Sequence, residues 1–331
     1  MKLAGLVLLA LTSTAVSAKP TFDEYLSTLR TESESLGFSE QTINDAFSSI
    51  NYRKKTIVHD KAQPERQKIT LDAYIPRAVP EWKIAKARKL FLENKELLER
   101  IGKDFGVQPR FIVALWGVET NFIVALWGVE TNFGNYTGNF STLSALATLA
   151  YDGRRETFFK KEFFAALKII DEGHITATDM KGSWAGAMGQ VQFMPSSFNA
   201  YAVDYNKDGK KDIWNNTADA LASAANYLKQ AKWDDTYTWG RQVLLPDNYD
   251  AQVSGLKLTK KLNEWQSLGI RTYEGNSLPK VDLNASLIMP DGENGRIYLV
   301  YNNYKSIMRW NRSDYFATSV AHLSDAIKFK D

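Results

Sequence analysis

The sequence predicts a mainly helical α+β protein that carries a small antiparallel β insertion. Two observations support this fold class. Apolar residues recur at helical spacing through most of the chain before Trp233, and short alternating runs replace this spacing after it. The chain then returns to helical spacing near its end, so the β segment is expected to lie within a helical protein.

The predicted helices follow from this spacing. The polar stretch 51–80 contains Pro64 and Pro76 and is expected to be extended, because proline interrupts helices. The segments with helical spacing are 21–50, 82–105, the repeated segment described below, 141–151, 155–172 and 313–327.

The predicted β lobe covers about 235–303. Its alternating runs are 242–245, 285–289 and 296–301. Pro290-Asp291-Gly292 separates the last two runs and predicts a turn between them.

The first 18 residues are typical of a signal peptide. Lys2 supplies the positive charge, an apolar run follows, and Val16-Ser17-Ala18 forms a small-residue cleavage site. The run is short for a bilayer, and no later segment is long and apolar enough to span one. The absence of cysteine excludes disulfides, thiol chemistry and a lipid-bearing cysteine. We therefore expect a soluble periplasmic protein that is exported and is not a lipoprotein.

The net charge excludes one class of partner. A charge of +3 without a Lys/Arg stripe is too mild for a nucleic-acid-binding surface, although it is compatible with an anionic polymer.

Eleven residues occur twice in succession. FIVALWGVETN covers residues 111–121 (copy one) and again 122–132 (copy two), with one acid in each copy, Glu119 and Glu130. Apolar residues surround each acid, so the unit is apolar nearly all round, as a buried helix is. Burial raises the pKa of a carboxyl group, which suits a general acid, although a buried glutamate paired with an arginine is an equally good interpretation.

A glycine-rich segment, Gly182 to Pro195, is the second candidate for chemistry. Its glycines allow the backbone to approach a ligand, and Ser183, Gln190 and Gln192 offer hydrogen bonds. We expect Trp184 and Trp310 to lie near the ligand, because each is next to polar motif residues.

The third candidate is a metal loop, DYNKDGKKD, at residues 204–212. Its oxygen donors and its glycine match the start of an EF-hand loop, but position twelve is Asn215 where glutamate is usual. A solvated turn is the alternative interpretation. The expected calcium ligands are Asp204, Asn206, Asp208, the Lys210 carbonyl and Asp212, with Asp219 as the closing carboxylate.

Taken together, these stretches resemble the lytic murein transglycosylase B family (glycoside hydrolase family 103). The motifs that carry the resemblance lie within 85–325 and are VQPRFIVALWGVETNFG, LATLAYDGRRETFF, GSWAGAMGQVQFMPSSF, DYNKDGKKDIW and WNRSDYF. The resemblance implies a single multi-lobed catalytic region: a helical lobe (19–110), a lysozyme-like core with the EF-hand-like loop (111–234), the β lobe (235–303) and a return to the core (304–331).

The resemblance also implies an activity: non-hydrolytic cleavage of the MurNAc-β-1,4-GlcNAc bond of peptidoglycan, with a 1,6-anhydro product. The single catalytic glutamate of the family falls on Glu130, with Glu119 as the alternative. The family's substrate-binding residues fall on Ser183, Gln192 and Asn311. Trp310 stands where the family usually has tyrosine.

Only one copy of the repeat can fill one helix position. Copy two is favoured because Gly134 follows it and can end the helix, whereas copy one keeps the lead-in Val107 to Arg110. The alternative functions are a hydrolytic muramidase, which needs a second acid, and a peptidoglycan-binding protein whose site the duplication has impaired.

Overall fold

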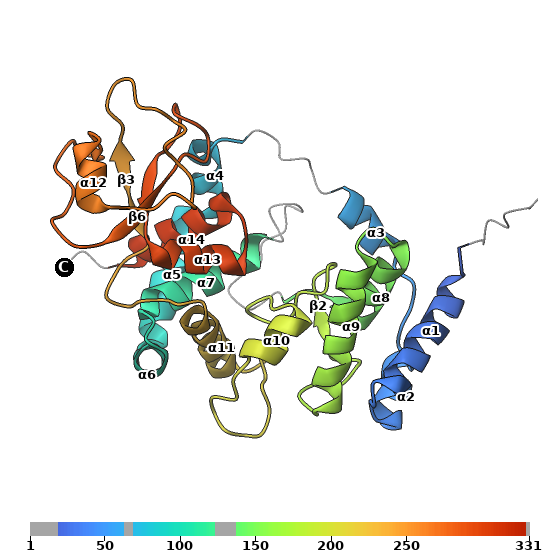
Figure 1. Ribbon diagram of the computed structural model, residues 1–331. Coiled ribbons are helices and arrows are strands. Elements are labelled where there is room, and N and C mark those ends of the chain that lie inside the picture. The colour runs from blue at the N-terminus through green and yellow to red at the C-terminus, as the bar shows by residue number, and fades with distance from the viewer. Residues whose placement is uncertain (1–18, 63–68, 123–136, 329–331) are drawn as a thin grey trace, which may run out of the picture.

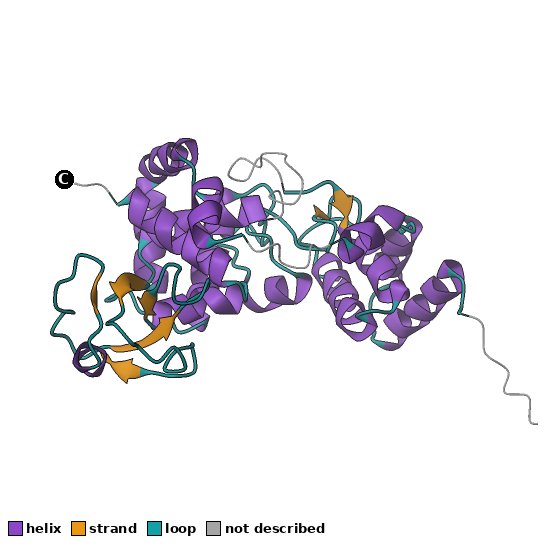
Figure 2. Ribbon diagram, turned by 90° about the horizontal axis from the view of Figure 1, so that it is seen from above, coloured by secondary structure: helices purple, strands orange, loops and turns teal. Residues whose placement is uncertain are grey.

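The protein is elongated, with a helical lobe at one end and a β sheet at the other (Figures 1 and 2). The computed structural model describes residues 19–62, 69–122 and 137–328, with the backbone alone for 116–122. Helices dominate, and the described strands pair antiparallel, so the predicted α+β class is confirmed.

The helical lobe contains three N-terminal helices and two helices from the middle of the chain. They are α1 (Phe22–Ser35), α2 (Glu40–Ser48), α3 (Lys54–Lys61), α8 (Thr142–Asp152) and α9 (Glu156–Asp171). Helix α8 is buried from Thr142 to Ala150, because α1, α3 and α9 pack around it. Ser141 caps its first turn, and Gly153 ends it in the left-handed conformation at φ +91°.

Eight further helices form the middle of the molecule. They are α4 (Leu71–Ala78), α5 (Glu81–Glu93), α6 (Lys95–Phe105), α7 (Pro109–Phe122), α10 (Pro195–Tyr201), α11 (Thr217–Gln230), α13 (Asn302–Trp310) and α14 (Asp314–Ile327). Helix α7 contacts α14, α5, α11 and α6, and its residues 111–115 are fully buried.

The sheet at the far end has the strand order β4-β6-β7-β3-β5. Its own apolar core includes Trp265, Leu287 and Leu299, and in the register Leu287 faces Leu299 across β6 and β7. The elements are β3 (Gly240–Leu244), β4 (Lys260–Lys261), α12 (Leu262–Ser267), β5 (Arg271–Thr272), β6 (Asn284–Ile288) and β7 (Tyr298–Val300). A separate pair, β1 (Phe140–Ser141) and β2 (Lys181–Gly182), lies beside the helical lobe.

The extended structure expected over 51–80 is wrong, because α3 and α4 lie there. Both helices are short, and tertiary contacts stabilise them: Ile57 is buried where α3 packs on α8, and Leu71 where α4 packs on α14. Pro76 lies inside α4 and cannot donate the intrahelical hydrogen bond to Asp72, so this helix depends on its tertiary contacts. The long helical run 82–105 is divided at Asn94 into α5 and α6.

Candidate active site

The glycine-rich segment forms a tight turn around Ser183. The Ser183 Oγ accepts hydrogen bonds from the backbone amides of Ala185 (3.3 Å) and Ala187 (3.0 Å), and the Ser183 amide donates to the Ala187 carbonyl (2.7 Å). A Cβ atom at Gly182 would lie 2.2 Å from the Ala187 oxygen, so only glycine fits there. The turn leaves the hydroxyl hydrogen of Ser183 unused by these contacts, and the hydrogen can be donated to a ligand.

Gln192 lies at the other end of this segment in a strained conformation. Its φ is +48°, which is uncommon for a residue other than glycine, and its side chain is buried. The Nε2 group donates to the carbonyls of Thr137 (3.1 Å) and Gly189 (2.9 Å). Within the described part of the chain, Oε1 is buried and accepts no hydrogen bond. An unpaired buried acceptor is costly and marks a position where a donor from a ligand can bind.

Trp310 lies in an aromatic cluster with Phe193, which directly follows Gln192. The Trp310 ring is 5.1 Å from Phe193 and 4.6 Å from Tyr227, measured between ring centroids. Asn311 ends α13, and its carbonyl accepts from the Ser313 amide (2.8 Å), while its own side chain is half-buried. The structure therefore brings Phe193, the residue after Gln192, against Trp310, the residue before Asn311, although the two segments are far apart in the sequence.

The aromatic partners of Trp310 were not predicted from the sequence. Phe193 directly follows Gln192 in the glycine-rich motif, and this adjacency was the available signal. Tyr227 lies on α11 outside the quoted motifs, and nothing in its local sequence marks it.

Trp184 is buried. Only 8% of its surface is exposed, and its ring lies 6.1 Å from that of His59, in α3. Trp184 packs α3 against the glycine-rich turn, and its place near the ligand stays a prediction.

The repeat is described only in part. Copy one continues the helix that begins at Pro109, so the backbone of Glu119 lies in α7. Copy one thus fills the helix position that we expected copy two to fill. Glu130 lies outside the described residues. Thr137, the first described residue after the repeat, is the residue that Gln192 contacts.

The EF-hand-like loop is folded around its own acids. The Asp204 carboxylate accepts from the Gly209 amide (2.9 Å), and Asp208 accepts from the Lys210 amide (2.9 Å). Gly209 has φ +92°, the left-handed conformation that the sharp turn of such a loop requires. The hydrogen bond from Asn206 lowers the pKa of Asp208 below its usual value.

Asp219 reaches this loop from α11. It is fully buried, and its oxygens accept from the amides of Tyr205 and Asp212, both at 2.9 Å. Burial raises its pKa. Asp219 therefore holds the loop backbone. The loop supplies hard oxygen donors that fit calcium in type, but within the described residues no three acidic, His or Cys side chains gather as a metal cluster.

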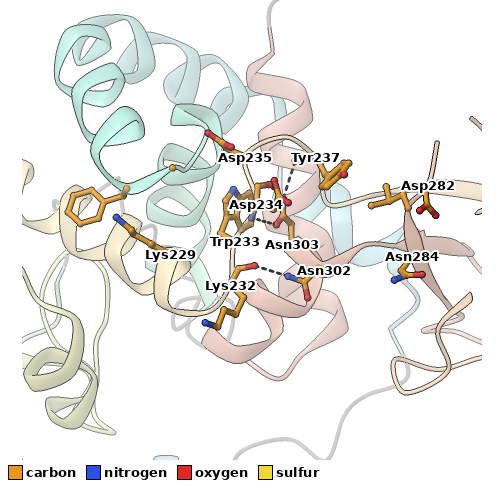
Figure 3. A pocket seen from close by; sticks show the side chains of 13 residues that line it. Lys229, Lys232, Trp233, Asp234, Asp235, Tyr237, Asp282, Asn284, Asn302 and Asn303 are labelled. Carbon is orange, nitrogen blue, oxygen red and sulfur yellow. Dashed lines mark hydrogen bonds between the residues drawn. The ribbon is translucent and has the colours of Figure 1, made fainter. Parts of the chain in front are cut away.

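A cavity of about 590 Å³ is lined by residues that include Asp204 and Asn206 of the loop. Two larger cavities adjoin the elements described above. The larger, about 950 Å³, is lined by residues that include Thr137, Lys210 and Asp212. The smaller, about 640 Å³, lies between the end of α11 and the β lobe and is lined by Lys229, Trp233 and Tyr237 among others (Figure 3). None of the predicted site residues lines this smaller cavity. Over the part of the chain that the structure describes, no helix is long and apolar enough to cross a membrane.

The chain is similar to known transglycosylases. The transglycosylase SLT domain family matches residues 21–122 and 121–325. The first match ends at Phe122, one residue beyond copy one, and the second begins at Asn121, one residue before copy two, so each match contains one complete copy.

Individual relatives agree with this match. The membrane-bound lytic murein transglycosylase B of Escherichia coli is 34% identical over 284 residues, which are 84% of this chain and 67% of the relative. The crystal structure of SltB3 from Pseudomonas aeruginosa in complex with NAG-NAM-pentapeptide has a TM-score of 0.86 at 35% identity, over 93% of this chain and 79% of that one. The E. coli lytic transglycosylase Slt35 in complex with calcium has a TM-score of 0.74 at 26% identity, over 94% and 93% of the two chains. The predicted lysozyme-like transglycosylase fold is confirmed.

Proposed function

The chain belongs to the SLT transglycosylase family, whose relatives are lytic murein transglycosylases, and we propose that it cleaves the MurNAc-β-1,4-GlcNAc bond with one glutamate acting as acid and then as base. The carboxylic acid donates its proton to the glycosidic oxygen, and the GlcNAc leaving group departs. The resulting carboxylate accepts the proton of the MurNAc 6-hydroxyl as that oxygen bonds to C1. The product is a 1,6-anhydro sugar, and no water is consumed.

The observation that carries this proposal is the buried, unpaired Oε1 of Gln192. An amide held by two backbone carbonyls keeps this acceptor fixed, and a sugar hydroxyl or N-acetyl N–H is a donor that it can bind. Ser183 and Asn311 supply further neutral hydrogen-bonding groups, and the half-buried ring of Trp310 supplies an apolar surface for a sugar.

The acid is assigned to the glutamate of the repeat. Glu130 has the downstream glycine of the family motif, and Glu119 has the described helix α7. Both belong to the same eleven-residue motif, so the chemistry is the same for either one.

The test is digestion of purified peptidoglycan, followed by mass analysis of the muropeptides. We expect anhydro-muropeptides from the natural chain and none from Glu119→Gln/Glu130→Gln. Products that are one water heavier would identify a hydrolytic muramidase. Binding to peptidoglycan without turnover would identify the impaired binding protein that the duplication makes the second candidate.

Two further assignments belong to this proposal. Asp204, Asn206, Asp208, Asp212 and the Lys210 carbonyl would hold one calcium ion, which would cross-link the loop and take no part in the reaction. The protein would be exported by residues 1–18, so that it meets peptidoglycan in the periplasm.

A further inference from the structure

Only three residues distinguish the lead-in of one copy from that of the other. Copy one follows Gly106-Val107-Gln108-Pro109-Arg110, and copy two follows Gly117-Val118-Glu119-Thr120-Asn121. Both lead-ins begin with Gly-Val, so they differ at the last three positions only. Gln108, Pro109 and Arg110 precede copy one, and Glu119, Thr120 and Asn121 stand at the same positions before copy two. We infer that Gln108, Pro109 and Arg110 hold copy one in the helix position of α7, which makes Glu119 the catalytic acid; this assignment rests on the proposed function.

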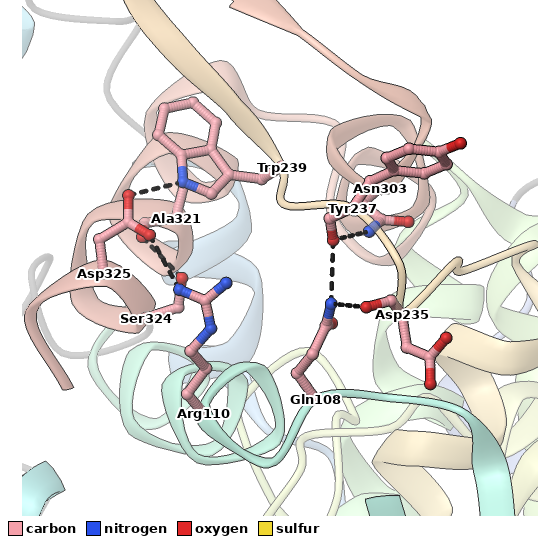
Figure 4. Close-up of polar contacts among 9 residues, drawn as sticks. All are labelled: Gln108, Arg110, Asp235, Tyr237, Trp239, Asn303, Ala321, Ser324 and Asp325. Atoms are coloured by element: carbon pink, nitrogen blue, oxygen red, sulfur yellow. Dashed lines mark hydrogen bonds and ion pairs between the residues drawn. The ribbon is translucent and has the colours of Figure 1, made fainter. Parts of the chain in front are cut away.

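Gln108 uses both ends of its amide, and Figure 4 shows the contacts of the nitrogen end. Its Nε2 group donates to the carbonyls of Asp235 and Tyr237, the latter at 2.9 Å. Its Oε1 accepts from the indole Nε1 of Trp233, also at 2.9 Å. If copy two filled α7, Glu119 would take this place, and its carboxylate has no hydrogen to donate to two backbone carbonyls.

These contacts join α7 to a rigid part of the molecule. Asn303 on α13 donates to the same Tyr237 carbonyl (3.0 Å) and to that of Asp234, so the loop that Gln108 binds is fixed from both sides. The Trp233 ring also packs against Phe111, with ring centroids 4.6 Å apart. A change at position 108 would therefore leave the Asp235 carbonyl and the buried Trp233 indole without this partner, while the Tyr237 carbonyl would keep only Asn303.

Pro109 is the first residue of α7 and packs on α6. Proline suits the first position of a helix, since its φ is already helical and no intrahelical partner is available for its nitrogen. A Cβ atom at Gly102 would lie 3.2 Å from the Pro109 ring, which shows how closely the two helices approach. Threonine at this position has neither the ring nor the fixed φ.

Arg110 links α7 to α14. Its Nη1 lies 3.1 Å from Asp325 Oδ1, and Asp325 Oδ2 accepts from the Trp239 indole (2.8 Å) (Figure 4). Arg110 is 18% exposed and Asp325 49%, so solvent weakens this ion pair. Asparagine is too short to make the same contact and carries no charge.

The contact on the other side of the repeat does not discriminate between the copies. Thr137, which accepts from Gln192, follows both copies in the sequence and is available whichever copy fills the helix. The described contacts that separate the copies are therefore on the lead-in side, and each of them favours copy one.

The first experiment reads out which copy is buried and does not depend on activity. The natural chain has no cysteine, so Ala114→Cys and Ala125→Cys are matched single-thiol variants within identical local sequence. Ala114 is fully buried. We expect Ellman's reagent to label the Ala125→Cys variant at least about tenfold faster than the Ala114→Cys variant under native conditions. Equal rates, or the reverse order, would overturn the inference.

The second experiment tests the lead-in itself. The triple change Gln108→Glu/Pro109→Thr/Arg110→Asn makes the two lead-ins identical, and in that background we expect the protection of Ala114→Cys to fall toward that of Ala125→Cys. Arg110→Lys keeps the charge and is expected to keep the protection. Unchanged protection in the triple variant, with a native circular dichroism spectrum, would contradict the role of these three residues.

Activity then separates this inference from the proposed function. Glu119→Gln is expected to lower the rate of peptidoglycan lysis about 100-fold or more, and Glu130→Gln to change it less than about threefold. The opposite ranking would overturn the inference while the proposed function stands. Deleting either copy gives the same single-copy sequence, and failure of that chain to lyse peptidoglycan would refute the proposed function while the labelling result stands.

Discussion

At the scale of single residues, Gln192 combines a positive φ with a buried acceptor that the described protein leaves unpaired. Both features destabilise the fold, and the hydrogen bonds of Nε2 offset only part of that cost. A position that keeps two unfavourable features is best explained by a ligand that removes one of them. Ser183 differs, because its oxygen is already used to close the turn.

Gln192→Gly and Gln192→Ala separate the two features. Both variants lack the amide, so we expect peptidoglycan lysis to fall about tenfold or more, but not completely, in each. Glycine adopts positive φ freely, so the Gly variant should be more stable than the Ala variant by about 1 kcal/mol in urea unfolding. Natural activity in the Gly variant would show that the side chain has no part in binding.

His322 makes the stability of the protein depend on pH. Burial and the charge of Arg296 lower its pKa to about 4, and its Nε2 lies 3.0 Å from the Tyr298 hydroxyl. The unfolded chain, with an ordinary histidine pKa near 6.5, binds the proton more tightly, so stability falls as the pH drops from about 6.5 to about 4. At pH 5 this loss is about 2 kcal/mol.

The measurement is urea unfolding at pH 7.5 and pH 5 of the natural chain and of His322→Gln. The variant should lose about 2 kcal/mol less on acidification than the natural chain. An equal acid-induced loss in both proteins would show that His322 is not the group responsible.

At the scale of helices and strands, the spacing of apolar residues predicted an element correctly wherever one face of that element packs on a neighbour. The segments that form α1, α2, α8, α9 and α14 were predicted as helices. The strands β3, β6 and β7 were predicted as well, with the turn at Gly292. The short helices α3 and α4 were missed, because tertiary contacts rather than local spacing stabilise them.

The candidate site shows the same limit. The residue types at Ser183, Gln192 and Asn311 were visible in motifs, but the burial of Trp184 depends on α3, which the sequence did not reveal. The choice between two identical copies could not come from the copies themselves. It depends on contacts of Gln108 and Arg110 with residues more than a hundred positions away.

The EF-hand-like loop supports a prediction at the same scale. Calcium that binds only the folded chain should raise the melting temperature. At a calcium concentration of one hundred times the dissociation constant, binding would add about 2.7 kcal/mol to the free energy of unfolding. Asp208→Ala should abolish this rise, whereas Asp247→Ala, an exposed acid of the β lobe, should not. Identical melting curves of the natural chain in chelator and in millimolar calcium would refute the site.

At the scale of the whole molecule, α3 and α4 follow one another in the chain but are bound to opposite ends of the elongated protein. Helix α3 is bound to the helical lobe, where the buried Asp60 pairs with Arg154 (2.5 Å) and Arg155 (2.7 Å). Helix α4, only a few residues later, is bound near the β lobe, where Asp72 pairs with Arg296 at 2.6 Å. The middle helices between these anchors, α7 among them, are buried in one apolar core, and a densely packed core does not absorb a second eleven-residue apolar segment without a change in packing.

The chain carries two such segments, and this predicts a stability cost for the whole molecule. Each copy of FIVALWGVETN has seven apolar residues. Whichever copy fills α7, the seven apolar residues of the other copy need a place outside that helix position. The single-copy chain keeps the lead-in, one glutamate and Gly134, and restores the spacing of the family motif. We therefore expect it to melt several degrees higher than the natural chain and to lyse peptidoglycan at least as fast. The matched control replaces copy two with eleven Gly and Ser residues, which keeps the length but removes the apolar surface, and should recover part of the gain. A single-copy chain that melts lower than the natural one would mean that the second copy packs productively and that the duplication stabilises the fold.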